Sequence, residues 1–219
     1  MQIIFPEQAL KKRQALLEAV ESLRNVLESS ADEAESLGTL PAATVDAIYA
    51  TGLFSFKTPR ILGGAEADAM TQLDVIEAAS RIDPAAGWCL MIGAGTLSNI
   101  GAFASDEAID NIFLDGKPPK AAGVAAPSGE AIVVEGGYNV SGRWSFASGI
   151  RHSEWVAGGA VVQNPCDGTS RQIRLVVPTS QVHIHDNWQV VGLKGTGSCD
   201  YSLSDVFVPD KFTWPGAEP

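Results

Sequence analysis

The sequence has little cysteine, little histidine and few basic residues. Its three cysteines, Cys89, Cys166 and Cys199, are far apart and form no Cys-x-x-Cys pair, which argues against a disulfide framework or a zinc site. We therefore expect a reducing, cytoplasmic environment. Fifteen lysines and arginines stand against 26 acidic residues, a formal net charge of −11, and no basic run is present to neutralise phosphates. Nucleic acid is thus not an expected partner.

Long hydrophobic runs are also absent by inspection. Residues 1–10 carry no basic region ahead of an apolar run, and no stretch approaches the roughly 18 apolar residues that a membrane span needs. We expect neither secretion nor membrane insertion. Hydrophobic residues make up 45% of the 219 positions, enough for a substantial core. The composition predicts a soluble globular protein.

The hydrophobic period changes near Gly116-Lys117-Pro118-Pro119, which predicts two domains, residues 1–117 and 118–219. Upstream, apolar residues recur at helical spacing, and we expect helices over 7–35, 42–50, 70–82, from 85 to about 97, and 105–114, with a loop over 56–68. Downstream, alternation and turn residues predict strands over 138–144, 155–163, 171–177 and 199–208. The expected fold class is α+β, an all-helical N-terminal domain followed by a small antiparallel β-sheet or barrel.

The sequence predicts one β-hairpin more clearly than any other element. The β-branched run Ile132-Val133-Val134 precedes Gly136-Gly137, and we expect both glycines to supply the positive φ angles of a tight turn. The strand that follows ends in a cluster of aromatic and small residues, 144–149. Such a cluster suits a flat aromatic ligand.

Four segments, in this order, resemble the acyl-CoA dehydrogenase superfamily: 59–64, 81–88, 142–149 with His152 and Trp155 behind it, and 191–198 followed by 206–209. The second and third segments are similar to the branch of two-component monooxygenases that use reduced flavin. The resemblance implies a flavin, FMN or FAD, held between the helical and sheet domains, since an isoalloxazine needs an apolar wall and polar groups at its edge.

The resemblance also implies which residues would contact the ligands. Residues 123–127 would present backbone groups to the pyrimidine edge of the flavin, Trp144 and Phe146 would wall its ring, and Ser148 would donate a hydrogen bond to its edge. The full implied cofactor set is Val124, Ala126, Pro127, Trp144, Phe146, Ala147 and Ser148. Trp88 and Thr96 would border the substrate pocket. From the local sequence alone, Trp144 has a second interpretation as a core aromatic of its strand.

The implied reaction is hydroxylation of an aromatic or apolar small molecule by reduced flavin and oxygen, with a separate flavin reductase as partner. Hydroxylases of this branch carry a histidine where this chain has Thr96, so no catalytic residue is assigned. Two alternatives stay open: an acyl-CoA dehydrogenase acting on CH-CH groups, and a truncated non-catalytic flavin-binding fragment or partner subunit.

The superfamily's third domain, a helical bundle, has no counterpart after residues 214–219. We therefore expect a fragment or one part of a split protein, with an exposed apolar patch, that forms a homo-oligomer if the bundle is supplied.

Three other patterns have plainer interpretations. His183 and His185 share a strand face but lack further ligands, so we expect a half-exposed pair and no metal site. Residues 194–198 place their lysine ahead of the glycines and precede a strand, so we expect a turn and not a phosphate loop. Ser148 lacks the glycine pattern of a hydrolase nucleophile.

Overall fold

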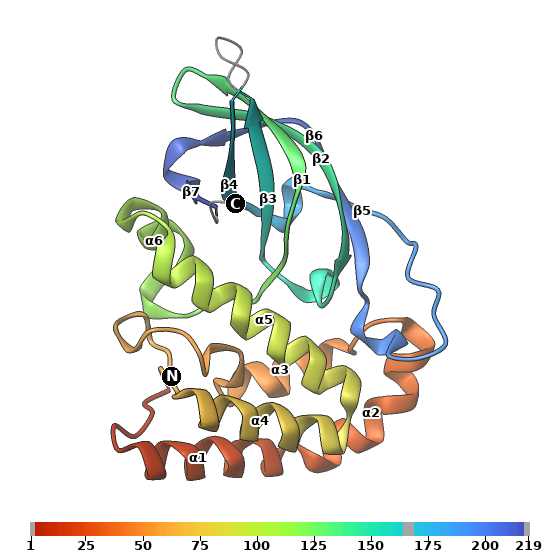
Figure 1. Cartoon of the computed structure of the whole chain (residues 1–219). Helices are drawn as coiled ribbons and strands as arrows, with labels where there is room; N and C mark the ends of the chain where they lie inside the picture. Colours follow the sequence, from red (N-terminus) through yellow and green to blue (C-terminus); the bar gives the residue numbers. More distant parts are fainter. Residues whose placement is uncertain (1–2, 164–168, 217–219) are drawn as a thin grey trace.

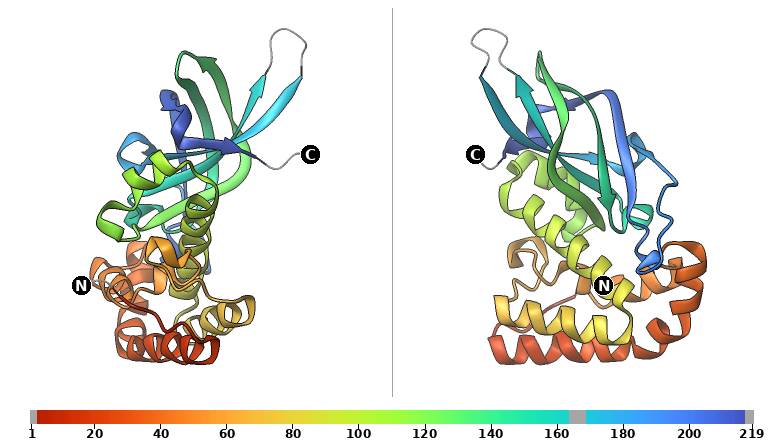
Figure 2. Two further views of the ribbon diagram at one scale, coloured as in Figure 1. Left: turned by 90° about the vertical axis from the view of Figure 1, so that its left-hand side faces the viewer. Right: turned by 45° about the vertical axis from the view of Figure 1, so that its right-hand side comes forward.

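A computed structural model describes residues 3–163 and 169–216. It has two layers, a stack of helices beneath a curled sheet (Figures 1 and 2). The helices are α1 (Ala9–Ser22), α2 (Arg24–Leu37), α3 (Ala42–Ala50), α4 (Ala69–Ile82), α5 (Pro84–Phe103) and α6 (Asp106–Ile112). The strands are β1 (Ala121–Val134), β2 (Gly137–Ala147), β3 (Trp155–Gln163), β4 (Ser170–Pro178), β5 (His183–Ile184), β6 (Cys199–Pro209) and β7 (Thr213–Pro215). The predicted α+β class is confirmed.

Helix starts follow the capping residues in the sequence. Asp68, Asp83 and Ser105 accept hydrogen bonds from the first-turn backbone N–H groups of α4, α5 and α6, at 3.0, 2.9 and 3.1 Å. Pro84 takes the first position of α5, where its missing N–H costs nothing. The predicted helix over 42–50 matches α3 at both ends. These starts were predictable because the caps act locally.

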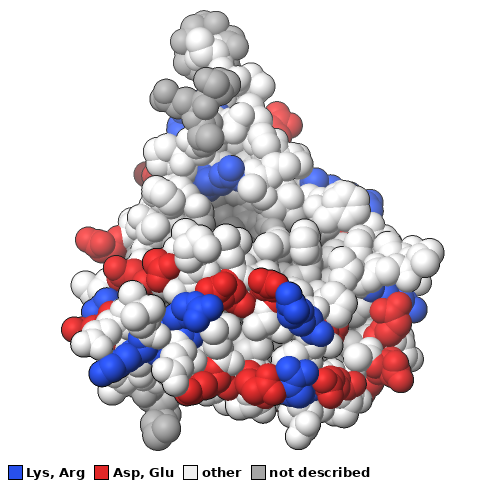
Figure 3. Space-filling view, turned by 60° about the horizontal axis from the view of Figure 1, so that its bottom comes forward, with Lys and Arg blue, Asp and Glu red and all other residues white. Residues whose placement is uncertain are grey.

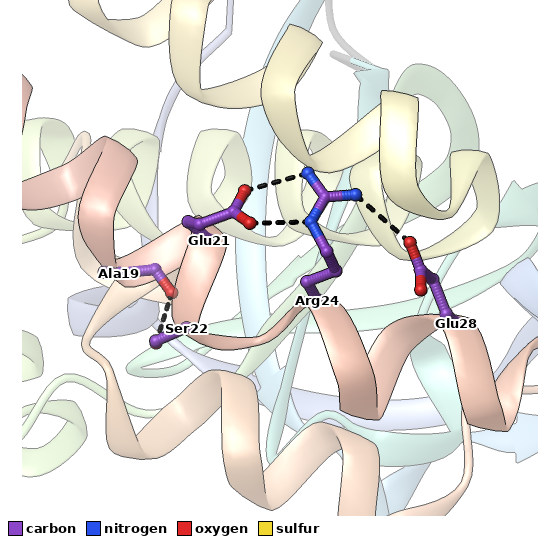
Figure 4. A network of polar contacts seen from close by, with 5 residues as sticks. All are labelled: Ala19, Glu21, Ser22, Arg24 and Glu28. Atoms are coloured by element: carbon purple, nitrogen blue, oxygen red, sulfur yellow. Dashed lines mark hydrogen bonds and ion pairs between the residues drawn. The ribbon is translucent and has the colours of Figure 1, made fainter.

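The single helix expected over 7–35 is wrong: the chain turns at Leu23 between α1 and α2 (Figure 4). The Leu23 N–H bonds to the Val20 carbonyl at 3.0 Å, a tighter spacing than the α-helical one. Across the turn, the Arg24 guanidinium bonds Glu21 in a bidentate pair at 2.6 and 2.8 Å and Glu28 at 3.1 Å. The bend lets the apolar faces of both helices follow one core.

The sheet is open, in the order β5-β6-β2-β1-β3-β4-β7, so the barrel alternative is not found in the described residues. All its neighbours are antiparallel except β1 and β3, which pair in parallel. This corrects the expected all-antiparallel sheet. Because β2 already occupies one edge of β1 through the hairpin, β3 pairs on the other edge after the chain has crossed over.

The hairpin turn is confirmed, but its geometry is corrected. Val134 pairs with Gly137, so the turn residues are Glu135 and Gly136, and only Gly136 has a positive φ, +78°. Gly137 is a strand residue: a Cβ there would stand 2.3 Å from the Val208 carbonyl oxygen. Gly137 is therefore required by close strand packing and not by the turn.

α5 is the central helix. It contacts α4, β1 and the short helix η6 (Lys194–Thr196). By length and composition α5 is apolar enough to cross a membrane, which corrects the expectation that no such stretch exists. Nine of its 20 residues are buried, among them Leu90, Ala94 and Leu97, and these belong to the cores of the fold.

The two layers meet through α5 and η6. One core cluster joins Leu97 and Ile100 of α5 to Val176 of β4 and Trp214 of β7. At the other end of α5, η6 reaches down from the sheet to α2 (Figure 1), and a Cβ on its Gly195 would stand 3.0 Å from Ala34 and 3.3 Å from Ala85. The predicted turn at 194–198 thus packs against the helical layer and connects it to the sheet; we call this contact the η6 clamp.

Candidate functional site

A break in β1, an interior strand of the sheet, leaves a short stretch of its backbone without strand partners. β1 pairs with β3 up to Val124 and again from Gly129, with a register shift between them, and it pairs with β2 only from Gly129 onward. Residues 125–128, here called the β1 break, are exposed. Gly159 lies beneath them, where a Cβ would stand 2.9 Å from the Ala126 carbonyl oxygen. The break therefore leaves backbone groups that are paired in neither ladder on an exposed segment.

Trp144 supports this break from inside the core. Its side chain is fully buried, stacks on Tyr201 with ring centroids 4.9 Å apart, and donates from Nε1 to the Gly159 carbonyl at 2.8 Å. Cβ atoms at Gly129 and Gly158 would stand 2.3 and 3.1 Å from the Trp144 indole. The structure thus corrects the prediction that Trp144 walls a ligand, and favours its second interpretation as a core aromatic.

Phe146 lies at a second break, in the ladder between β2 and β6. The register shifts between Trp144 and Ala147, and Phe146 takes a φ of +69°, a left-handed conformation that is strained for a bulky residue. Its side chain is 68% exposed, and its ring contacts Trp188 edge-on at 6.1 Å between centroids. Strain and exposure at one aromatic residue point to a ligand-facing role.

Ser148 belongs to a chain of hydroxyl groups whose direction is fixed at both ends. The Trp88 Nε1–H donates to Ser148 Oγ at 2.9 Å, and Thr196 Oγ1 donates to the Leu193 carbonyl at 2.8 Å. Between them, Ser198 Oγ lies 2.7 Å from both Ser148 Oγ and Thr196 Oγ1. Each hydroxyl has one proton. Ser148 must therefore donate to Ser198, and Ser198 to Thr196.

In this arrangement Ser148 accepts from Trp88 and directs its own proton at Ser198. A bond from Ser148 to a ligand would require this hydroxyl chain to reorient, and the predicted role of Ser148 at the flavin edge stays a prediction. The bond from Trp88 also connects α5 to the end of β2, which fixes the indole ring at the surface, where it is 41% exposed. Ser148 therefore acts on the site by holding Trp88.

A cavity of about 440 Å³ lies between α5 and the sheet, and we call it the α5 cavity. Its floor is the open face of α5, from Met91 to Asn99, and its wall is residues 123–125 of β1 with Ala157 and Gly158 of β3. Figure 3 shows the surface hollowed between the sheet and the charged helical layer. At 440 Å³ the cavity is within the size range of small-molecule sites.

The charged groups of the α5 cavity are both cations, Lys57 and Arg174. The Arg174 guanidinium donates to the Ala125 carbonyl and so stabilises the β1 break. Burial lowers the pKa of the Lys57 ammonium. No acidic residue is among those that line the cavity in the described chain, although the protein as a whole is strongly acidic.

Four of the predicted ligand residues lie at the α5 cavity or in the β1 break. Val124 and Thr96 line the α5 cavity, Thr96 directly opposite Gly123. Ala126 and Pro127 lie exposed in the β1 break, whereas Ala147 is fully buried. Lys57, Asn99 and Arg174 were missed, because each is one polar residue in an unremarkable stretch and only the tertiary fold brings it to the cavity.

Other candidates lie elsewhere. His183 and His185 contact each other at 4.6 Å between ring centroids, away from the residues of the α5 cavity, and no group able to hold a metal ion was found in the described ranges 3–163 and 169–216. Cys89 and Cys199 are buried free thiols. Cys166 lies outside the described residues.

His152 is a half-buried histidine whose Nδ1 atom is shielded from solvent. Its Nδ1 has no hydrogen-bond partner among the described residues, and its ring lies 6.1 Å from the Phe54 ring. Burial, helped by the charge of Lys120, lowers the pKa of His152 to about 4. This residue is neutral at physiological pH and does not line the α5 cavity.

Comparison with known proteins assigns the fold to a family. Residues 11–113 match the family model of the acyl-CoA dehydrogenase N-terminal domain. XiaF from a Streptomyces species, solved in complex with FADH2 and glycerol, superposes with a TM-score of 0.89 at 30% identity, over 95% of this chain and 52% of XiaF. The chain belongs to the acyl-CoA dehydrogenase superfamily.

Within this superfamily the similar curated proteins are oxygenases. The oxygenase subunit HsaA, a flavin-dependent monooxygenase of Mycobacterium tuberculosis, is 32% identical over 90% of this chain and 49% of HsaA. The oxygenase component of an FADH2-dependent resorcinol hydroxylase from Rhizobium is 32% identical over 92% of this chain and 50% of that protein. The chain thus spans about half the length of the curated relatives it matches.

Proposed function

We propose that this chain forms the helical and sheet part of the oxygenase of a two-component, flavin-dependent monooxygenase that hydroxylates an aromatic substrate. The similarity to oxygenase components over nine-tenths of the chain supports this reading over an acyl-CoA dehydrogenase. A separate flavin reductase and a cytoplasmic location belong to the same proposal, and the absence of a Cys-x-x-Cys pair among the three cysteines is consistent with that location.

The single structural observation that carries the proposal is the β1 break. Residues 126–128 are exposed and paired in neither ladder, so their backbone suits the polar edge of an isoalloxazine, and the exposed ring of Phe146 suits its flat face. The residues present therefore fit a flavin. When bound, reduced flavin supplies the electrons that activate oxygen for insertion into the substrate.

This chain's own residues position the reactants. Arg174 holds the Ala125 carbonyl, and Gly159 leaves room for the break above it. Trp88, fixed by Ser148, and the open face of α5 would exclude water from the substrate and orient its ring.

The β1 break can be tested by a glycine pair. A Cβ at Gly159 would stand 2.9 Å from both the Ala126 oxygen and Pro127 Cα, so Gly159→Ala must displace the break, whereas Gly192 has nothing within 4 Å. We expect Gly159→Ala to weaken binding of reduced FMN or FAD by about 10-fold, roughly the effect of one lost or strained hydrogen bond. Gly192→Ala should leave it unchanged.

Binding is measured by anaerobic fluorescence titration, and thermal unfolding checks that each variant is folded. Incubation with a flavin reductase, oxygen and an aromatic substrate, followed by product analysis, then measures formation of the hydroxylated product. A folded parent chain that binds neither reduced flavin would contradict the proposal, as would equal affinities for Gly159→Ala and Gly192→Ala.

A further inference from the structure

Lys57 places an ammonium group inside the α5 cavity. The residue follows the short helix η1 (Leu53–Ser55), and its Nζ lies 3.8 Å from the point where a Cβ on Gly95 would stand. Gly95 is part of the cavity floor, next to Thr96. The missing side chain at Gly95 therefore leaves open space beside the ammonium, on the face of α5 that a substrate would contact.

This ammonium has no partner, in contrast to other lysines of the fold. Lys120 and Lys211 form ion pairs with Glu154 and Glu107, both at 2.7 Å. Within residues 3–163 and 169–216, no oxygen forms a hydrogen bond or ion pair with Lys57 Nζ; its recorded contact is the Phe56 ring, 5.7 Å from Nζ to the centroid. An ammonium has three protons to donate. Those of Lys57 are available to a ligand.

The electrostatics of the cavity favour an anion. Arg174 donates one N–H to the Ala125 carbonyl and adds its positive charge to the cavity, whereas the ammonium of Lys57 has all its protons free for a substrate. Because the half-buried ammonium has lost part of its hydration, its pKa is lowered, and a bound anion would stabilise its charged form. Thr96 and Asn99 add neutral polar groups on the same floor.

We infer that Lys57 binds an acidic oxygen of the substrate and so selects aromatic compounds that carry a phenol or a carboxylate. This inference rests on the proposed function for the aromatic character of the substrate. The preference for an ionised oxygen follows from the unpaired ammonium and from a cavity lining without carboxylates. Lys57 is thus a specificity-determining residue of the same site.

The test uses the full chain and three small probes. Para-nitrophenol ionises to a coloured phenolate, para-nitrobenzoate carries a carboxylate, and para-nitroanisole is their uncharged analogue. Lys57→Met keeps the apolar stem and removes the charge, whereas Lys57→Arg keeps the charge. Lys117→Met is the matched control, since Lys117 is an exposed lysine outside the α5 cavity and its loss changes the net charge equally.

We expect Lys57→Met to weaken binding of at least one ionised probe by about 10-fold or more, as for the loss of a charge-assisted hydrogen bond, and to leave para-nitroanisole unchanged. In the parent chain, the absorbance of bound para-nitrophenol should show a lowered phenol pKa that Lys57→Met restores. Whichever ionised probe depends on Lys57 identifies the phenol or the carboxylate as the recognised group.

Equal binding of both ionised probes by the parent chain, Lys57→Met and Lys117→Met would overturn the inference, and so would a parent chain that binds none of the probes. The reduced-flavin titration described above is run on the same preparations. If the chain binds reduced flavin but the binding of the ionised probes does not depend on Lys57, only the role of Lys57 is refuted. Lys57-dependent probe binding without flavin binding refutes the proposed function and leaves the anion site standing.

Discussion

Replacing Trp144 by phenylalanine should destabilise the protein without removing a ligand contact. The substitution deletes the hydrogen bond from Nε1 to the Gly159 carbonyl, measured at 2.8 Å, and opens a gap in a site with no solvent exposure. The lost bond contributes about 1 kcal/mol. A gap of roughly 40 Å³ at about 24 cal/mol per Å³ contributes about another 1 kcal/mol.

We therefore expect Trp144→Phe to lower the free energy of unfolding by about 2 kcal/mol, and Tm by about 4–8 °C for a chain of this size. The assay is urea unfolding, followed by thermal unfolding of the same samples. Phe146→Ala is the control on the same strand: its ring is 68% exposed, so its unfolding should change by less than about 0.5 kcal/mol.

The two variants distinguish a residue that stabilises the fold from one that contacts the flavin. Phe146→Ala should weaken binding of reduced flavin while leaving stability intact, because this ring is exposed and that of Trp144 is fully buried. If Trp144→Phe unfolded like the parent chain but lost its affinity for flavin, the burial argument would be refuted and Trp144 would be a wall of the ligand site after all.

Two further predictions concern buried polar groups. Ser198→Ala removes both hydrogen bonds of the hydroxyl chain and leaves the buried Ser148 without that partner, so urea unfolding should show a loss of about 1–2 kcal/mol. The exposed Ser180→Ala should show no measurable loss, and equal stability of the two variants would contradict a stabilising role of the chain. His152 has its pKa lowered to about 4 from 6.5, so the unfolded chain binds its proton first and stability should fall, by up to about 3 kcal/mol, as pH drops from 6.5 toward 4. His152→Gln should flatten this part of the pH–stability curve, and an unchanged curve would show that His152 is not the responsible group.

Local signals predicted the helical half well. The caps Asp68, Asp83 and Ser105 each bond an N–H within three residues, so helix starts depend on short-range signals. The predicted starts at 70, 85 and 105 lie within one residue of those of α4, α5 and α6. The turn at Leu23 could not, because it depends on how two helices share one core. The resemblance to the superfamily was confirmed because four segments carried it in the right order.

The sheet was harder to predict. Only the end of β1 has β-branched residues; its first half, residues 121–129, is rich in alanine and glycine, which have low strand propensity. Its parallel pairing with β3 is a long-range contact that no local pattern reports. The register shift after Trp144 also changes which side chains face the core, so alternation along β2 could not tell that Trp144 is buried and Phe146 exposed.

The η6 clamp has a consequence for synthesis of the chain. Residues 1–112 carry every α-helix described, yet η6 docks on α2 and α5 from positions 194–196, near the opposite end. During translation the helical half therefore emerges long before the segment that covers the meeting point of α2 and α5. At a translation rate of roughly 5–20 residues per second, this surface stays exposed for several seconds before η6 is synthesised. Over this interval the nascent chain exposes Ala34 and Ala85, and chaperone capture at this spot would be governed by the elongation rate, not by the stability of the finished fold.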